Sequence, residues 1–445
     1  MSEPKSNQLI PRRRFLSSTA MLGSSLLVGA HAPAQESAEP INVAVIGTGT
    51  QGQVLINSCV RIPGIRIRAI CDIWENYNLN RASQILTAFQ QEHTVYSDYQ
   101  DMLGQEKDLQ AVIIATPDFC HAPQTVDCLK AGLNVYCEST MSNSIDGARA
   151  MVQAARESGK YLQIGHQRRS NPRYQFCFAH IINETRLLGE ITALNAQWNR
   201  AVQAERGYPR RSPLDEAILK KYGYESMHQF RNWNWYKGLG GGPVTELASH
   251  QVDVLNWYMG TPPKSILASG GVAYYSPENH QMPDTVMAVL EYEIPKRNVR
   301  AMYQSINNNS NFGYLESFMG DQGTLYITEA TGRTKVYREP AAPDWDKWVK
   351  IGYLDSPVVK EKEKTSEAVL DIQESVLPPE YNIPVQLNDS VFKPHLENFF
   401  NAIRGSEPLN CPAEIAFQST VTTLKILEAI ESGQTARITP EDLTV

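Results

Sequence analysis

The chain has 445 residues, of which 42% are hydrophobic and 20% are charged, so it is long enough for two domains with separate cores. Its formal net charge of -7 argues against nucleic acid or an anionic membrane as its main partner. The 7 cysteines form no CxxC pair and fall mostly in apolar segments, so we expect buried free thiols and neither a disulfide framework nor a zinc site.

The N-terminal segment has the parts of an export signal. Arg12-Arg13-Arg14-Phe15-Leu16 precedes a short apolar stretch, and Ala32-Pro33-Ala34 forms a small-x-small cleavage pattern. The apolar stretch is too short to span a membrane. The paired arginines resemble the twin-arginine signal, which carries proteins that have already folded. We therefore expect residues 1–34 to be a signal peptide and the mature protein to be periplasmic or otherwise extracytoplasmic, with no membrane-inserted segment.

A glycine-rich turn follows the first apolar strand of the mature chain. The strand Asn42–Ile46 leads into Gly47-x-Gly49-x-x-Gly52 and then into a helical stretch. The first glycine permits a tight turn, the second lets a pyrophosphate approach the backbone, and the third lets the helix pack on the strand. The helix N-terminus then faces the phosphate charge. This order of elements is typical of a dinucleotide site.

A second apolar strand, Arg66–Cys71, ends at an acidic residue. Asp72 lies 20 residues after Gly52, where a carboxylate accepts hydrogen bonds from the adenosine ribose hydroxyls. A carboxylate at this place repels a 2′-phosphate, so NAD is favoured over NADP. Arg66 and Arg68 keep NADP open as the second possibility.

Strands and helices continue to alternate up to about residue 165. This alternation predicts a parallel sheet covered by helices, which we assign as a Rossmann domain over residues 40–165. Ligands of such sheets bind beyond the carboxyl ends of the strands, here Ala115–Asp118 and Cys137-Glu138. The further strands are Leu109–Ala115, Leu133–Cys137 and Tyr161–Ile164, with a helical pattern at Gly147–Glu157.

The pattern changes after residue 165, where strands follow one another without helices between them. Alternating apolar residues predict an α+β C-terminal domain over residues 166–445 with an open antiparallel sheet. Pro295–Asn298 fits a hairpin loop. Residues 340–394 are expected to be an irregular insertion, and helical periodicity returns at His395–Arg404 and Pro412–Ser432. Examples of the expected strands are Ile191–Trp198, Val286–Ile294, Val299–Ile306 and Thr324–Thr328.

Polar residues that suit acid–base chemistry lie on the expected helix Val244–Met259. On a helical wheel Glu246, His250, Asp253 and Trp257 share one narrow stripe. Glu246 and His250 are four residues apart and can hydrogen-bond, which would orient the imidazole as a general base. A solvated helix face with an incidental ion pair is the alternative. A metal site made by these side chains lacks a fourth ligand, so we expect no metal.

These motifs together resemble the glucose-fructose oxidoreductase/inositol dehydrogenase (Gfo/Idh/MocA) family over almost all of the mature chain. The resemblance implies that His250 is the catalytic base and that Glu246 replaces the usual aspartate. It implies carbohydrate or polyol substrates between the nicotinamide and the C-terminal sheet, and homodimer or homotetramer contacts on that sheet. The matching segments are VIGTGTQG from Val45, ATPDFCH from Ala115, GLNVYCE from Gly132, IGHQRRSNP from Ile164 and GGGPVTELASHQVD from Gly240.

The resemblance also assigns the cofactor contacts. The dinucleotide would be held by the glycine-rich turn, with Thr48 and Gln51 between its glycines, and by Asp72. The nicotinamide half would be lined by Thr116, Pro117, His121 and Glu138.

One departure from the family lies after the strand that ends at Cys137. The usual Glu-Lys-Pro is Glu138-Ser139-Thr140 here, and in the family that lysine stabilises the developing alkoxide. Three interpretations follow. Another cation substitutes, with Lys237, Arg168 and His166 as candidates; or the protein is a redox-neutral, NAD-dependent glycosidase, a class that also lacks the lysine; or it binds sugar without turnover.

Two further segments are candidates for contact with substrate. Met227–Lys237 is rich in aromatic residues, on which the C–H faces of sugars stack. We expect Tyr236 and Lys237 to contribute to catalysis or substrate binding. Arg168 and Asn171 are expected to bind substrate, with Arg169 in a surface or interface ion pair.

These observations predict an exported, NAD-dependent oxidoreductase of a sugar, glycoside or polyol. Export separates the protein from free NAD, so we expect the cofactor to stay bound and to be recycled in place.

Overall fold

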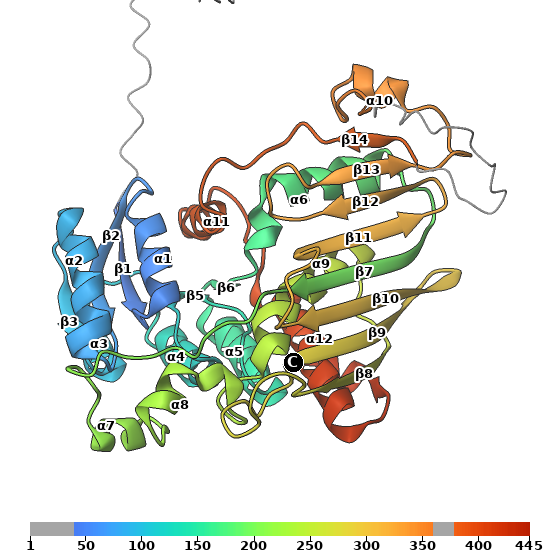
Figure 1. The fold of residues 1–445 in the computed structure, drawn as a ribbon. Coiled ribbons are helices and arrows are strands. Elements are labelled where there is room, and N and C mark those ends of the chain that lie inside the picture. The colour runs from blue at the N-terminus through green and yellow to red at the C-terminus, as the bar shows by residue number, and fades with distance from the viewer. Residues whose placement is uncertain (1–39, 359–377) are drawn as a thin grey trace, which may run out of the picture. The chain divides into compact units, whose positions relative to one another are not determined.

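Two β-sheets organise the residues that the structure, a computed structural model, describes, namely 40–358 and 378–445 (Figure 1). The expected signal peptide, residues 1–34, lies outside this range. Within the described range no helix has the length and apolar character that would be needed to span a membrane.

The first sheet is fully parallel, and its strand order is β3-β2-β1-β4-β5-β6. The Rossmann expectation is confirmed, with one strand more than the apolar runs indicated. That strand, β3 (Thr94–Tyr96), is three residues long and partly exposed, so it has no apolar run. The other strands are β1 (Ile41–Ile46), β2 (Ile65–Cys71), β4 (Ala111–Ile114), β5 (Asn134–Cys137) and β6 (Leu162–Ile164).

Helices cover both faces of this sheet (Figure 1). They are α1 (Thr50–Cys59), α2 (Asn80–Ala88), α3 (Tyr99–Gln105), α4 (Asp118–Lys130) and α5 (Ile145–Ser158), with one π-helical turn at Glu75–Leu79. Strand register sets the position of the site. Ile46 pairs with Ile114, and Ile114 pairs with Cys137. The residues that follow β1, β4 and β5 therefore meet at one edge, where parallel sheets bind ligands.

The second sheet has nine strands in the order β14-β13-β12-β11-β7-β10-β9-β8-β15. All of its pairs are antiparallel except β7 with β10, so the predicted antiparallel sheet is mixed at this one place. The expected hairpin is present, because Ile294 pairs with Arg297. The strands are β7 (Ile191–Asn199), β8 (Ser265–Gly271), β9 (Thr285–Ile294), β10 (Arg297–Ile306), β11 (Tyr314–Gly320), β12 (Gly323–Ile327), β13 (Lys335–Arg338), β14 (Glu380–Asn382) and β15 (Ala436–Arg437).

Helices α9 (Ser249–Met259) and α12 (Ala413–Ser432) pack against the second sheet and share its apolar core. The opposite face of strands β8, β9 and β10 is exposed. Helix α11 (Lys393–Ile403) instead packs on the first sheet, where Leu396 and Phe399 join the core made by β1 and β2. The chain therefore returns from the second sheet to cover the Rossmann domain.

Short elements complete the fold. The segment expected to be irregular, 340–394, contains α10 (Asp346–Lys350) and the edge strand β14, and residues 359–377 of it lie outside the described range. The remaining elements are α6 (Pro172–Phe176), α7 (Glu216–Lys221), α8 (Met227–Arg231) and α13 (Pro440–Leu443), the 3-10 turns Gln167–Ser170 and Trp233–Trp235, and the π-helical stretches Cys177–Glu184 and Val244–Ala248.

Candidate active site

The glycine-rich turn after β1 has the shape that a pyrophosphate requires. Gly47 has a φ of +86°, and an added Cβ would lie 2.6 Å from the Ala115 carbonyl oxygen. At Gly52 a Cβ would lie 2.0 Å from the Gly47 carbonyl oxygen. At Gly49 the nearest atom to an added Cβ is the Asn78 amide nitrogen at 3.9 Å. Gly49 is also the N-cap of α1 and makes no side-chain cap, so the backbone N–H groups there suit a phosphate.

Asp72, directly after β2, is 8% exposed and hydrogen-bonded on both carboxylate oxygens. The Thr48 backbone N–H donates to one oxygen at 2.8 Å, and the Trp74 backbone N–H donates to the other at 2.8 Å. The Asn78 side chain also donates to this carboxylate. Burial raises the pKa of Asp72, and the hydrogen bonds oppose that effect. The carboxylate thus stands beside the glycine-rich turn, at the place expected for the ribose.

Arg66 and Arg68 lie in β2, before its carboxyl end. Both line a surface groove together with Asn42, Glu106 and Asp108. Asp72 is not among the residues of this groove.

The residues predicted to line the nicotinamide lie in the loops after β4 and β5, which His121 connects by hydrogen bonds. His121 is 1% exposed, and its ring nitrogens lie 2.8 Å from the Thr140 carbonyl oxygen and 2.7 Å from that of Thr116. Burial lowers the pKa of His121. The Thr116 hydroxyl donates to the Gln124 side chain, and Pro117 is the N-cap of α4. His121 therefore joins the loops after β4 and β5 and fixes their spacing.

Glu138 follows β5 and is 8% exposed. The Gln51 side chain donates to it at 2.8 Å and the Ser139 backbone N–H at 3.2 Å, so Glu138 connects the glycine-rich turn to β5. Burial raises its pKa to about 7. Gly165 leaves the room for this carboxylate, because a Cβ there would lie 2.3 Å from a Glu138 oxygen.

The imidazole of His250 comes from the other domain and meets this edge of the Rossmann sheet. Its Nε2 lies 3.2 Å from the Ser139 Oγ. Among the described residues its Nδ1 has no hydrogen-bond partner. The His166 ring stands edge-on to it, with 5.7 Å between centroids. Burial, followed by the charges of His166 and Arg168, holds the pKa of His250 well below its usual range. The ring is therefore neutral at neutral pH, the form in which one of its nitrogens has a free lone pair.

The predicted hydrogen bond between Glu246 and His250 is not formed, so this prediction was wrong. Glu246 is instead held by Arg200, whose guanidinium nitrogens lie 3.3 and 3.4 Å from its oxygens, and by the Asn234 amide at 3.2 Å. The cause is local geometry. Residues Val244–Ala248 form a π-helical turn with a wider bonding pattern, so side chains four residues apart no longer lie above one another.

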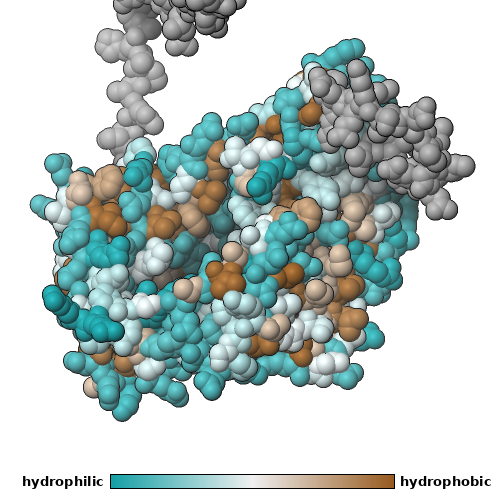
Figure 2. Space-filling view, in the orientation of Figure 1, coloured by the Kyte–Doolittle hydropathy of each residue, from teal (hydrophilic) through white to brown (hydrophobic). Residues whose placement is uncertain are grey.

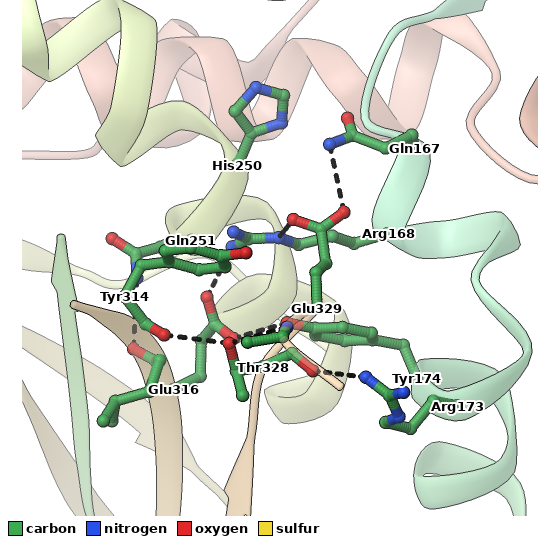
Figure 3. A network of polar contacts seen from close by, with 12 residues as sticks. Gln167, Arg168, Arg173, Tyr174, His250, Gln251, Tyr314, Glu316, Thr328 and Glu329 are labelled. Carbon is green, nitrogen blue, oxygen red and sulfur yellow. Dashed lines mark hydrogen bonds and ion pairs between the residues drawn. The ribbon is translucent and has the colours of Figure 1, made fainter. Parts of the chain in front are cut away.

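Arg168 is a buried structural cation, which corrects its predicted role in substrate binding. It is 1% exposed and pairs with Glu316 and with Glu329, the latter at 3.0 Å (Figure 3). The Tyr174 hydroxyl donates to Glu316 from the other side. The Trp198 ring contacts the Arg168 guanidinium at 5.3 Å and lies 6.3 Å from the His250 ring. Arg168 therefore acts on His250 through its charge and packing.

Arg169 was expected at the surface but is also buried. It makes two hydrogen bonds, of 2.8 and 3.0 Å, to Asp253, which is 0% exposed and also accepts from the Ser419 hydroxyl. Asp253 thus serves this ion pair. The described residues contain no group of three or more His, Cys, Asp or Glu side chains that could hold a metal ion. All 7 cysteines are free, and all except Cys120 are buried, as predicted.

The other residues that were predicted to bind substrate, Tyr236, Lys237 and Asn171, contact groups other than His250. The Tyr236 hydroxyl bonds to His228, which bonds in turn to Glu205. The Lys237 ammonium pairs with Glu431 at 3.0 Å beside a cavity of about 200 Å³. Asn171 is 1% exposed and caps α6 by accepting from the Arg173 backbone N–H.

Several site residues were missed from the sequence. Trp74 and Asn78 orient Asp72, while Arg200 and Asn234 hold Glu246. No motif marks them: Trp74 and Asn78 lie 2 and 6 residues after Asp72 in a turn without regular spacing, and Arg200 lies 46 residues before Glu246. Ser139 was noticed as a replacement for a lysine, but not as a partner of His250.

The described chain thus joins a parallel sheet that carries a glycine-rich dinucleotide turn to a second domain that supplies an imidazole. Residues 41–166 match the family described as "Oxidoreductase family, NAD-binding Rossmann fold", and residues 184–438 match its "C-terminal alpha/beta domain". The chain belongs to this Gfo/Idh/MocA family.

Curated relatives cover parts of the chain. Inositol 2-dehydrogenase of Rubrobacter xylanophilus is 36% identical over 31% of this chain and 38% of its own length. A glycosyl hydrolase family 109 protein of Stenotrophomonas maltophilia is 34% identical over 28% of this chain and 29% of its own. The matches thus span well under half of these relatives.

Solved structures share the fold over most of the chain. A levoglucosan dehydrogenase in complex with NADH and L-sorbose aligns with a TM-score of 0.65 and 15% identity, over 90% of this chain and 99% of that one. The WlbA dehydrogenase of Bordetella pertussis, in complex with NADH and UDP-GlcNAcA, aligns with a TM-score of 0.62 and 18% identity, over 90% and 99%.

Proposed function

We propose that the protein oxidises a CH–OH group of a sugar, glycoside or polyol with a tightly bound NAD. The observation that carries this proposal is the position of His250. A neutral imidazole from α9 stands 3.2 Å from Ser139, at the strand end where a nicotinamide would lie. A general base beside that position is what alcohol oxidation requires.

The residues at the strand ends fit the cofactor. Gly49 leaves room for the pyrophosphate, Asp72 would accept from the ribose hydroxyls, and Glu138 and Thr116 would flank the nicotinamide. Asp72 favours NAD, since a carboxylate repels a 2′-phosphate, and the alternative cations Arg66 and Arg68 line a separate groove. The bound cofactor supplies a hydride acceptor. His250 then takes up the proton that the substrate hydroxyl loses.

Polar groups near the base suit a hydroxylated substrate. Glu246 is partly exposed, with 32% of its side chain accessible, and is fixed by Arg200 and Asn234. A carboxylate held in this way can accept hydrogen bonds from sugar hydroxyls. The relatives named above act on inositol or bind sugars according to their names, which supports a polyol or carbohydrate substrate.

A segment of the C-terminal domain covers the cofactor side of the Rossmann sheet, which supports a captive cofactor. Residues from α7 and α8 share an apolar cluster with Trp74 and Phe119. The Trp74 indole donates to the Ser212 carbonyl at 2.8 Å, and the Phe230 ring contacts Trp74 at 5.6 Å. Trp74 is two residues from Asp72, and Phe119 is in the first turn of α4. This cover would slow release of a dinucleotide, which suits a protein exported with its cofactor bound.

A redox-neutral glycosidase is the second candidate. Two observations favour it: Ser139 stands where the family has lysine, and the chain is 34% identical to a glycosyl hydrolase family 109 protein over a short region. In that reaction the hydride returns to the sugar after the aglycone has left.

The test of the proposed function compares the wild type with His250→Ala. We expect the variant to keep its bound nucleotide and to lose reduction of the nicotinamide by a panel of sugars and polyols, by about 100-fold or more. Aryl glycosides in the same panel report aglycone release. Loss of nucleotide from His250→Ala would mean that the residue is structural, and aglycone release without net reduction would favour the glycosidase.

A further inference from the structure

One hydroxyl group connects the imidazole of His250 to the Rossmann strand ends. Ser139 directly follows Glu138 after β5, and His250 is in the first turn of α9, 111 residues later. Their side chains meet across the two domains, with 3.2 Å between Oγ and Nε2. Both residues are of intermediate burial.

Within the part of the chain that the structure describes, the Ser139 hydroxyl is the one group that hydrogen-bonds to the Nε2 atom of His250. The Nδ1 atom of His250 has no partner there, and both nitrogens of His166 are equally without partners. His166 presents its ring edge-on at an interplanar angle of 85°. The remaining ring neighbour, Trp198, is aromatic. A proton that reaches Nε2 therefore comes through, or displaces, the Ser139 hydroxyl.

We propose that Ser139 is a catalytic relay that passes the proton of the substrate hydroxyl to His250. The proposal rests on the proposed function and deepens it. The substrate O–H gives its proton to Ser139 Oγ while Ser139 gives its own proton to His250 Nε2. A bound oxidised nicotinamide would supply the hydride acceptor for the electron pair of the neighbouring C–H bond, so that C–O becomes C=O. The imidazolium then returns its proton to solvent.

A hydroxyl is chemically suited to this step. It has one donor and two acceptor sites, so it can donate to the imidazole and accept from the substrate at the same time. An ammonium group has three donors and no acceptor, and it would repel the imidazolium that forms. A lysine at this position would stabilise an alkoxide by its charge. The serine would instead help to remove the proton of the substrate hydroxyl.

The test uses Ser139→Ala and Ser139→Thr in the full nucleotide-bound protein, with Ser432→Ala as control. Ser432 is exposed at the end of α12, where its hydroxyl donates to the Glu428 carbonyl and accepts from the Gln434 backbone N–H. The relay predicts that Ser139→Ala lowers kcat by about 100-fold or more with little change in KM or bound nucleotide. Ser139→Thr keeps the hydroxyl and should remain within about tenfold of the wild type. The control should match the wild type.

A second readout does not depend on turnover. The ¹⁵N resonances and titration of His250, followed by NMR without sugar, should change in Ser139→Ala and stay close to wild type in Ser139→Thr. An unchanged or faster kcat in Ser139→Ala, with an active wild type, would overturn the relay alone. A wild type that oxidises no sugar would overturn the proposed function and the relay with it, even if the NMR signals show the hydroxyl–imidazole pair.

Discussion

Glu138 is a buried acid whose protonation should affect stability. Burial raises its pKa in the folded protein to about 7 from an ordinary 4.5. The folded state therefore holds this proton more tightly than the unfolded chain does. As the pH rises from about 5 to 7 the free energy of unfolding should fall, by up to about 3 kcal/mol from this group.

Glu138→Gln removes this titration, so the free energy of unfolding of the variant should fall less steeply across the same window. Denaturant unfolding at several pH values measures both slopes. Asp118, whose pKa burial also raises to about 7, contributes the same sign to both proteins and cancels in the comparison. Equal slopes for the variant and the wild type would show that Glu138 is not protonated in the fold.

Among individual residues, the sequence predicted the positions of those that are fixed by local spacing. The positions of Gly47, Gly49 and Asp72 in the fold could be predicted because the turn and the strand end fix them within one βαβ unit. The role of Arg168 was missed, because its partners, Glu316 on β11 and Glu329 just after β12, lie far away in the sequence and nothing in the local pattern indicates them.

The helical segment over the cofactor side gives a prediction about nucleotide exchange. Phe230, on α8, packs edge-to-face on Trp74, and truncating it opens the cover without touching the glycine-rich turn. Phe230→Ala should raise the rate of nucleotide release by about tenfold, or about 1.4 kcal/mol. Exchange of bound NAD against labelled NAD measures this rate directly.

Phe312→Ala is the matched control, since Phe312 is 73% exposed and lies outside this cluster. Its release rate should equal that of the wild type. A Phe230→Ala protein that is folded but exchanges no faster would mean that the cover does not retain the nucleotide.

Element types were easier to predict than their irregularities. Buried apolar runs indicated the parallel strands, because both faces of that sheet are covered. The π-helical turn at Val244–Ala248 has no recognisable sequence pattern, and it moved Glu246 away from His250. The strands β3 and β14 were among those not predicted, because three residues are too few to show a period, and the seven-residue strands β8 and β11 were not named either.

In the molecule as a whole, the second sheet leaves an apolar row uncovered. Leu267, Val289 and Met302 are neighbours across β8, β9 and β10 and are 56%, 41% and 55% exposed. Figure 2 shows hydrophobic surface mixed with hydrophilic surface over the region of this sheet. We propose that a second copy of the chain covers this row in a homodimer or homotetramer. In a twofold-symmetric contact the same apolar patch of two subunits is buried against itself.

Val289→Glu should convert the assembly to monomers, as measured by light scattering across a concentration series. The added charge would be buried without a partner in the interface. Phe312→Glu, outside the row, should leave the assembly unchanged. A wild type that is monomeric at all concentrations would contradict this proposal.

The Rossmann fold, the α7–α8 segment packed on Trp74 and the export signal expected in residues 1–34 together suit a cofactor that is loaded once and reused. The most direct test starts from protein purified without added nucleotide. Its absorbance at the reduced-nicotinamide band is recorded before and after addition of inositol, free sugars and aryl glycosides. The account predicts bound NAD and a band that rises with at least one sugar or polyol without aglycone release. Absence of bound nucleotide, or aglycone release with no net change in the band, would contradict it.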